Sequence, residues 1–434
     1  MRTLVMTALL CACAGIAEPA PGGPPANLTA RPNPDAAPAV YRNGLWYVAD
    51  ENGVRFEAGD RYQAGGVFVA TAPDGADIVD LSGAYIVPGF GEAHNHNLDG
   101  PWTAGRGQAY LRDGVFYMKN TNSVNSVDAW AAEAWETPGT VDIAWAHAGI
   151  SVDEGHPEAL YRRIANVYRL DPEELEGDVF WDAPDIATLE EKWPAILATE
   201  PDWIKLYLLH TEDEGERPLA GLSRAVFARA VELAHEAGLK ATVHVNTARD
   251  FAAAMAAGAD EAAHMPPQSV QGEEDRQRYS LTPEMARAAA RSGFVTVPTT
   301  ALIEAYETRN DPERERILEA TRDVQRENLR LLKEAGAPIA FGSDRYDGTG
   351  LTEALAVRRR GVFTDEEILR IAVETPSRSI FPDRAIGALS PGYEASFVAL
   401  ECDPRDDFAA CVAAPLRRIK QGIEVGATGA AQAD

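Results

Sequence analysis

Between residues 84 and 344 the chain alternates short apolar runs with longer segments rich in Ala and Glu. Apolar runs of this length, bounded by turn residues, are typical of buried strands, and the intervening segments carry helical patterning. Such alternation favours a parallel sheet with helices packed around it. The eight runs are AYIVPGFGEAHNHN from 84, GVFYMKN from 114, VDIAWAHAGI from 141, DWIKLYLL from 202, KATVHVN from 240, DEAAHM from 260, FVTVPTT from 294 and PIAFGSD from 338.

Helix boundaries between and after these runs are marked by capping residues. The capping signals are Ser223 with Gly238, Thr282-Pro283 with Gly293, and Thr364 with Glu367 as a capping box. Eight strands alternating with helices predict an α/β fold in which residues 89–384 form a (β/α)8 TIM-like barrel. Chemistry in such a barrel lies at the C-terminal ends of the strands.

Segments on both sides of the predicted barrel have β character. Residues 40–88 contain short apolar runs broken by Gly, Asp and Asn, and residues 385–427 resume this pattern in SFVALECDP and RRIKQGIEV. Neither half offers enough apolar surface to be stable alone. We therefore expect the two segments to pair in one small β domain.

The first residues, MRTLVMTALLCACAGIA, have the layout of an export signal: an early positive charge, a short apolar stretch and then small residues. This stretch is too short to span a membrane. Residues 10–13 are similar to a bacterial lipoprotein signal with Cys13 as the lipidated residue, whereas residues 15–17 suit ordinary signal peptidase. We expect residues 1–17 to direct export to the periplasm, with or without a lipid anchor, and residues 18–39 to form a flexible Pro/Ala/Gly-rich tether.

The formal net charge of −27 bears on the partners of the chain. Nucleic-acid phosphates are neutralised by Lys and Arg, so this charge argues against nucleic-acid binding. It also disfavours docking on anionic membrane surfaces. A small-molecule substrate is the expected partner, and the oligomeric state stays open.

Two cysteines, Cys402 and Cys411, lie outside the predicted signal. In an exported chain such a pair favours a disulfide, and the turn-rich DPRDDFAA between them could bring them together. Two separate buried thiols are the alternative. If the disulfide forms, the two Cα atoms should lie within about 7 Å of each other.

Ionisable residues gather at the ends of the predicted strands. Residues two apart on a strand point to the same side, so His94 and His96 share a face at the end of the first run. Lys205 lies opposite the aliphatic residues of its run, inside the barrel, where a lysine is costly unless it is paired, ligating or modified. A rim position or a helix cap explains any one residue, but not the convergence of all six: His94, His96, Lys205, His244, His264 and Asp344.

With these residues in place, the pattern resembles the amidohydrolase superfamily, in particular its metal-dependent amidase, dipeptidase and prolidase-like branch. The matching pieces are VPGFGEAHNH, DWIKLYL, VHVN, AAHM and GSD, with SPGYEASFVALECDPRDD near the C-terminus. The resemblance implies that residues 40–88 and 385–427 form a composite β-sandwich beside the barrel. Ser396 departs from the family, which usually has aspartate there, and this affects only local packing of the sandwich.

The resemblance also implies a site in which the six residues bind two divalent metal ions. Imidazoles and carboxylates suit zinc. Neutral Lys205 would add carbon dioxide to form a carbamate that bridges the metals, which would hold a hydroxide and polarise the substrate carbonyl. Asp344 would serve as general acid and base. The rival is a mononuclear site in which Lys205 is only hydrogen-bonded to a carboxylate.

The expected activity is hydrolysis of an amide or peptide-type C–N bond in an N-acyl amino acid, dipeptide or cyclic amide. A lactonase or phosphoester hydrolase could use the same metals. A deaminase would generally carry a glutamate three residues after His244, where Thr247 stands. A catalytically inactive scaffold has no need to keep all six residues.

Candidate substrate-binding residues are less well defined by the sequence. Tyr207 shares the face of Lys205, and His156 follows the third run, where it could sit at the mouth of a pocket. Arg345 and Tyr346 come directly after Asp344 and could anchor a carboxylate. Loop packing explains each of these four positions equally well.

Overall fold

The computed structural model describes residues 23–426 with the exception of 136, 212–219 and 307–310. The predicted export signal 1–17, with Cys13, lies outside the described residues, as do the first residues of the predicted tether. Among the helices of the described part, none combines the length and the apolar character that crossing a membrane requires.

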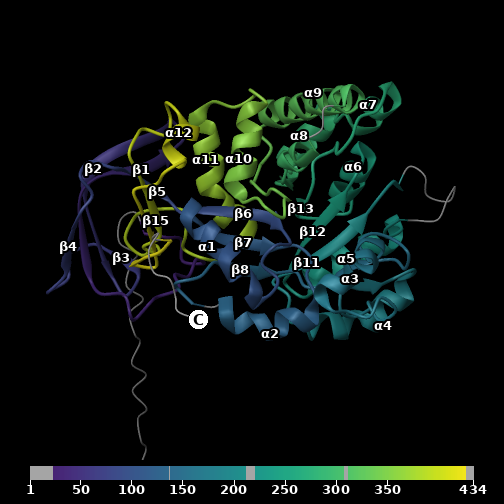
Figure 1. Ribbon diagram of the computed structural model, residues 1–434, viewed down its shortest axis with the longest axis horizontal. Helices are drawn as coiled ribbons and strands as arrows, with labels where there is room; N and C mark the ends of the chain where they lie inside the picture. The colour runs from purple at the N-terminus through teal and green to yellow at the C-terminus, as the bar shows by residue number, and fades with distance from the viewer. Residues whose placement is uncertain (1–22, 136, 212–219, 307–310, 427–434) are drawn as a thin grey trace, which may run out of the picture.

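One end of the molecule is a mixed sheet to which both ends of the chain contribute strands (Figure 1). Strands β1 (Ala39–Asp50) and β2 (Gly53–Ala64) form a long antiparallel hairpin. Strand β5 (Tyr85–Pro88) pairs in parallel with β1 and antiparallel with β15 (Phe397–Leu400). The other strands of this sheet are β3 (Val67–Val69), β4 (Asp77–Asp80), β16 (Arg417–Lys420) and β17 (Ile423–Glu424).

Aromatic side chains hold the C-terminal strand against the N-terminal ones. The ring of Phe397 lies 4.9 Å from that of Tyr41 and 5.6 Å from that of Trp46, centroid to centroid. All three side chains are buried. Burial of a Phe side chain contributes roughly 2–3 kcal/mol to stability, so this contact fastens the two chain ends together.

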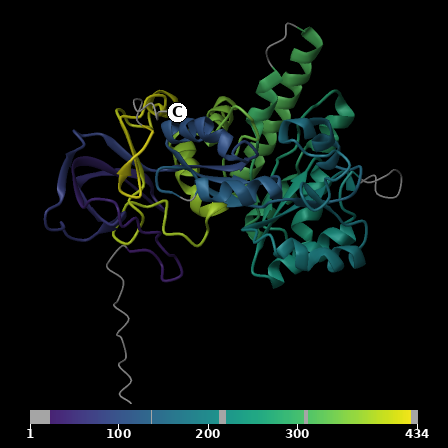
Figure 2. The same ribbon diagram turned by 60° about the horizontal axis from the view of Figure 1, so that its bottom comes forward.

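The rest of the chain alternates parallel strands with helices (Figure 2). The described pairings give a three-stranded sheet, β6-β7-β8, and a six-stranded sheet, β10-β9-β11-β12-β13-β14. The strands are β6 (Phe90–Asn95), β7 (Val115–Asn120), β8 (Asp142–Trp145), β9 (Gly149–Ser151), β10 (Phe180–Asp182), β11 (Trp203–Leu208), β12 (Lys240–Val245), β13 (Glu261–Ala262) and β14 (Val295–Thr296).

Helices cover these strands on both sides (Figure 1). The predicted caps are confirmed: Ser223 caps α5, Thr282 caps α8, and Thr364 opens α11 with a capping box. The helices are α1 (Ala104–Asp113), α2 (Asn125–Trp135), α3 (Glu158–Tyr168), α4 (Ile186–Leu197), α5 (Arg224–Glu236), α6 (Ala248–Ala256), α7 (Glu273–Tyr279), α8 (Pro283–Ser292), α9 (Pro312–Ala335), α10 (Gly350–Arg359), α11 (Asp365–Thr375) and α12 (Phe408–Val412), with short turns η1 (Pro101–Thr103), η3 (Thr300–Tyr306) and η4 (Pro376–Ile380).

The strands differ from the predicted ring in several places, including an unpredicted strand, β10, and the described pairings do not close a barrel. The third run is interrupted at His147, whose φ of 54° turns the chain between β8 and β9 and assigns them to different sheets. The eighth run, residues 338–344, forms no continuous strand, although Ile339 bridges Thr296 in parallel and Phe341 O accepts a hydrogen bond from Ala93 N at 2.8 Å. The structure therefore shows an α/β fold with a broken ring of strands.

The run that opens the alternation also divides in two. Its apolar part, β5, belongs to the terminal sheet, and only β6 belongs to the ring of strands. Gly89 separates them, and a Cβ at this position would approach the Phe116 ring to 2.2 Å. The close approach requires glycine and lets the chain pass from one sheet to the other.

Candidate metal centre

Three of the six ionisable residues lie within ligand distance of a common point. His94 and His96, at the end of β6, bring their Nε2 atoms within 3.2 Å of each other. Asp344 Oδ1 lies 3.7 Å from His94 Nε2 and 3.5 Å from His96 Nε2. The three groups offer ligand atoms that all lie within 4.8 Å of one another.

The other three residues face the same space. The ring of His264 lies 4.5 Å from that of His94 and 4.3 Å from that of His244, between centroids. His264 Nδ1 is 3.9 Å from Asp344 Oδ2. Lys205 is 1% exposed, and its Nζ has no hydrogen-bond partner among the described residues. The structure thus brings together all six residues that the sequence singled out.

Hydrogen bonds fix which nitrogen of each first-strand histidine faces the centre. His94 Nδ1 lies 2.6 Å from Ala263 O, and His96 Nδ1 lies 2.8 Å from Asn122 O. A carbonyl oxygen only accepts, so each Nδ1 carries the proton and donates it. Each Nε2 is then an unprotonated lone pair, and the two lone pairs oppose each other across 3.2 Å.

The site suppresses positive charge on its imidazoles. Burial, together with the charge of Lys205, lowers the pKa of His96 to about 3. Burial likewise holds the pKa values of His94, His244 and His264 well below the usual range. Neutral imidazole is the form that ligates metals. Two opposed lone pairs beside a buried amine without an acceptor therefore fit a divalent cation.

Lys205 and Asp344 both have perturbed acid–base behaviour. Burial lowers the pKa of Lys205 to about 7, although the charge of Asp344 opposes this change. Burial raises the pKa of Asp344 to about 7, and Lys205 acts in the opposite direction. Neutral amine and protonated carboxyl are thus both accessible near pH 7, which is typical of functional sites.

The asparagines that alternate with the histidines secure the loop after the eighth run. Asn95 Nδ2 donates to Ser343 Oγ at 3.0 Å and to Arg345 O at 2.9 Å. Asn97 Nδ2 donates to Gly348 O at 3.2 Å. Asp344, at the start of this loop, has a φ of 47°, a left-handed conformation that costs about 1–2 kcal/mol for a non-glycine residue. The asparagine contacts hold it there.

Sequence reasoning missed Glu92, a buried carboxyl beneath the centre. It accepts hydrogen bonds from Ser343 N at 2.8 Å, Ser343 Oγ at 2.7 Å and His94 N at 3.0 Å. Burial raises the pKa of Glu92 to about 8. The available signal was a glutamate inside a buried strand, at the same alternation as His94 and His96.

A cavity of about 210 Å³ opens beside His96 and Asp344. Three predicted substrate residues line it: Tyr207, His156 and Tyr346. The ring of His156 lies 4.7 Å from that of His244. The fourth, Arg345, is not among the lining residues, and its guanidinium pairs with the Asp347 carboxylate at 2.9 Å.

Asn122 is a second residue that the sequence argument missed. Its side-chain oxygen accepts a hydrogen bond from the Tyr207 hydroxyl at 3.0 Å, and its main-chain oxygen holds His96. Asn122 follows the second strand, β7, so the rule that picked out the other strand ends could have found it.

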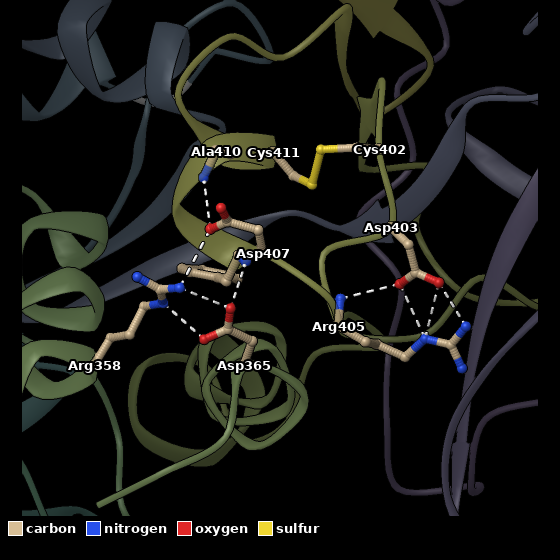
Figure 3. The surroundings of a disulfide bond; sticks show 9 residues. Arg358, Asp365, Cys402, Asp403, Arg405, Asp407, Ala410 and Cys411 are labelled. Carbon is tan, nitrogen blue, oxygen red and sulfur yellow. Dashed lines mark hydrogen bonds and ion pairs between the residues drawn. A yellow bond between two sulfur atoms is a disulfide. The ribbon is translucent and has the colours of Figure 1, made fainter. Parts of the chain in front are cut away.

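The predicted cysteine pair lies in the C-terminal segment, where Cys402 precedes α12 and Cys411 belongs to it. Cys402 and Cys411 are joined in a disulfide with a Cα–Cα separation of 5.4 Å (Figure 3). The loop between them is fixed by Asp407, whose side chain accepts from Ala410 N at 3.2 Å and from Arg358 Nη2 at 3.3 Å. The bond therefore braces the C-terminal segment.

Comparisons with known proteins agree with this architecture. A model of the amidohydrolase family matches residues 183–424, more than half of the chain. No curated protein sequence matches.

Solved structures with similar folds include three hydrolases. A prolidase complexed with N-methylphosphonate-L-proline has a TM-score of 0.69 at 19% identity and covers 90% of this chain and 99% of its own. Ochratoxinase from A. niger has a TM-score of 0.69 at 18% identity, with 90% and 96% covered. Molinate hydrolase has a TM-score of 0.68 at 16% identity, with 90% and 94% covered. At these identities the similarity demonstrates a shared fold.

Proposed function

Because this chain belongs to the amidohydrolase family, we propose that its metal centre hydrolyses an amide or peptide-type C–N bond in a small-molecule substrate. The hydrolase class follows from the family, and the bond and substrate are the proposal. N-acyl amino acids, dipeptides and cyclic amides are the candidate substrates. The observation that carries the proposal is the opposition of two unprotonated nitrogens beside a buried lysine that has no hydrogen-bond partner among the described residues.

Two divalent ions, with zinc the expected metal, would be held by the imidazoles, Lys205 and Asp344. Histidine nitrogens and carboxylate oxygens are the ligands that zinc prefers. A bound ion of this kind lowers the pKa of a water molecule and polarises a carbonyl group. The residues that would hold the ions are His94, His96, Lys205, His244, His264 and Asp344.

Lys205 is proposed to be a carbamate in the active enzyme. The neutral Nζ attacks the carbon of carbon dioxide, an N–C bond forms, and the proton released from nitrogen passes to solvent. The product is an anion with two ligating oxygens. Three observations support the carbamate: Lys205 is 1% exposed, burial lowers the pKa of its amine to about 7, and the surrounding imidazoles are neutral.

Asp344 is proposed as the general acid and base. Asp344 Oδ1 lies 3.5 Å from His96 Nε2, and the residue borders the cavity. Its carboxyl group therefore reaches both the centre and a bound substrate. A carboxyl whose pKa lies near 7 can accept a proton from the attacking water and return it to the leaving nitrogen. Tyr207, His156 and Tyr346 line the space where the substrate would lie.

The finer architecture belongs to the same proposal. We propose that the strands of residues 89–384 complete a (β/α)8 barrel around the centre, as the bridge between Thr296 and Ile339 supports. Residues 40–88 and 385–427 would form the small composite β-sandwich. Export is proposed from residues 1–17, with lipidation of Cys13 as one outcome, and the disulfide supports it because such bonds persist in oxidising compartments.

A substrate screen on metal-loaded protein tests the function. Purified enzyme with measured metal content is incubated with N-acyl amino acids, dipeptides, lactones and phosphoesters, and released amine, acid or phosphate is quantified. We expect amine release that disappears in the His94→Ala variant. Turnover of lactones or phosphoesters without any amide cleavage would overturn the assignment of the bond.

A further inference from the structure

Helix α3 forms one wall of the cavity beside the metal centre. Leu160, Tyr161, Ile164 and Tyr168 of this helix line the cavity, and Pro157 directly precedes it. Residues 160, 161, 164 and 168 lie on one helix face, because side chains three and four apart are neighbours. The helix therefore presents a mostly apolar surface opposite His96 and Asp344.

The described side chains that line the cavity include no cation to pair with a charged substrate group. Of the described residues that line it, none is lysine or arginine, and Asp344 is the acidic one. Arg163, also on α3, is exposed, although its charge contributes to lowering the pKa of His156. A carboxylate placed against the α3 wall, away from the proposed metals, would lose its hydration without gaining an ion pair from a side chain there.

Two tyrosines of the cavity wall, Tyr207 and Tyr161, have hydroxyl groups that are already hydrogen-bonded. The Tyr207 hydroxyl donates to Asn122 Oδ1 at 3.0 Å, and Asn122 Nδ2 donates to the Tyr161 hydroxyl at 3.5 Å. These bonds fix the rings before any substrate arrives, which reduces the entropy lost on binding. Ring faces and edges are left for offset or edge-to-face contacts.

The cavity is large enough for one aromatic ring and the bond that joins the ring to the rest of the substrate. Its volume is about 210 Å³, and an apolar cavity of about 150 Å³ holds benzene. Tyr168 borders this cavity and also a second one of about 540 Å³, which Trp102, Val127 and Val167 line as well. Tyr168 thus stands where a longer substrate group would pass from one cavity to the other.

We infer that the α3 wall binds a neutral apolar group of the substrate, aromatic or branched aliphatic, and that Tyr168 limits the length of that group. This inference rests on the proposed amide hydrolysis and names its substrate class. The enzyme then prefers amides with a bulky apolar substituent on one side of the scissile bond over amides with small or charged substituents at that position.

Two series of amides test the preference. The acyl side is varied as acetyl, isobutyryl, benzoyl and naphthoyl with the amine constant, and the amine side is then varied in the same order of size. A succinyl amide supplies the charged comparison. We expect kcat/KM to rise at least about tenfold from acetyl to benzoyl size on one side, because apolar pockets discriminate at this level per group. Equal kcat/KM values for acetyl-size and benzoyl-size substituents, in the acyl series and in the amine series alike, would overturn the inference.

Variants locate the preference on the helix. Ile164→Glu introduces a charge into the wall and should reduce the ratio of benzoyl-size to acetyl-size kcat/KM at least about tenfold. Ile186→Glu is the matched control, because Ile186 is 40% exposed at the start of α4 and does not line the cavity. Metal content and the circular dichroism spectrum should match the parent in both. An unchanged ratio in Ile164→Glu would refute the role of α3.

A second pair of variants tests whether Tyr168 limits the length of the bound group. Tyr168→Ala should join the two cavities and raise the ratio of naphthoyl-size to benzoyl-size kcat/KM several-fold, whereas Tyr168→Phe keeps the ring and should leave this ratio unchanged. Similar ratios in Tyr168→Ala and the parent would refute the length limit.

A binding measurement separates this inference from the proposed function. Benzamide, a neutral aromatic probe, is titrated against the metal-loaded protein by calorimetry. Binding that Ile164→Glu weakens at least about tenfold supports the apolar site even if no amide is hydrolysed, in which case only the proposed function fails. Amide hydrolysis without benzamide binding, and without a preference for size, overturns the apolar site alone.

Discussion

Two buried groups of charged residues in this molecule differ in whether their lysine is paired. Lys420, on β16, is fully buried and places Nζ 2.7 Å from Asp142. Arg384 pairs with the same Asp142 at 2.8 Å and with Glu394 at 2.7 Å. We call these four residues the scaffold cluster. Lys205, at the candidate metal centre, is equally buried, yet its Nζ has no hydrogen-bond partner among the described residues.

The contrast separates a structural from a functional use of buried charge. In the scaffold cluster each charge lies beside an opposite one, and the cluster ties the terminal sheet to β8. An unpaired buried lysine destabilises the fold, and local rules of this kind are broken mainly at functional sites. The comparison predicts that substitutions at the centre affect activity, while substitutions in the scaffold cluster affect stability.

Lys205→Ala should produce the largest change in activity. Without the proposed carbamate the metals lose a bridging ligand, so we expect kcat/KM to fall by about 10³-fold or more, in line with removal of a catalytic metal function. Metal content, measured by plasma mass spectrometry, should fall with it. Acetate or propionate should restore part of both. Two retained metals with near-normal turnover would contradict the carbamate.

The same variant should keep or gain stability, because it removes an unpaired buried amine. Urea denaturation of metal-free protein measures this without interference from metal binding. A large loss of stability in metal-free Lys205→Ala would mean that the two lysines have the same structural role.

Asp142→Asn should produce the largest loss of stability. It leaves Lys420 and Arg384 without their shared carboxylate, and breaking a buried pair costs about 3–5 kcal/mol. The control is Glu424→Gln, which removes the half-exposed partner of Arg417 on the same sheet and should cost about 0–1 kcal/mol. Urea denaturation gives both values, and activity per folded molecule should be unchanged. Equal losses of stability in Asp142→Asn and Glu424→Gln would show that the buried cluster stabilises the fold no more than an exposed ion pair does.

Removing the disulfide should have an intermediate effect on stability. The bond closes a loop between residues nine apart in sequence, and the chain-entropy model gives about 2–3 kcal/mol for a loop of this size. The Cys402→Ser, Cys411→Ser double variant should unfold at lower urea concentration with unchanged kcat/KM. Free thiols in non-reducing peptide mapping of the parent protein would show that the pair is not formed.

The smallest effect expected is the pH dependence of the scaffold cluster. Burial raises the pKa of Asp142, but Lys420 and Arg384 together outweigh burial and hold this pKa below its usual value. The folded-state pKa is thus lower than the unfolded one, so the contribution to stability is present above about pH 4 and is lost as pH falls through the folded value. Denaturation between pH 2 and 6 should show this decline, with a shallower one in Asp142→Asn.

Much of the centre could be predicted because its residues follow simple rules. Strand alternation pointed Lys205 inward, and the convergence of parallel strand ends brought residues as distant as His94 and Asp344 together. Capping signals such as Thr364 likewise depend only on neighbouring residues and gave correct helix starts.

Other features depend on contacts that the sequence does not display. The break at His147 arises from one left-handed residue inside an otherwise strand-like run. The division between β5 and β6 depends on the Phe116 ring lying against Gly89. The role of α3 in lining the cavity could not be predicted. The sequence pattern of an amphipathic helix is the same whether its apolar face packs on a core or on a substrate.

The alternation of histidine and asparagine from 94 to 97 sets an order of events in the making of this protein. The two histidines are synthesised early, but the loop that Asn95 and Asn97 clasp, and with it Asp344, emerges from the ribosome some 250 residues later. A chain that stops short of this loop has five of the six proposed ligands but lacks Asp344. We therefore expect metal loading to be among the last steps of maturation. Tightly bound metal would then indicate that the loop with Asp344 has packed against β6.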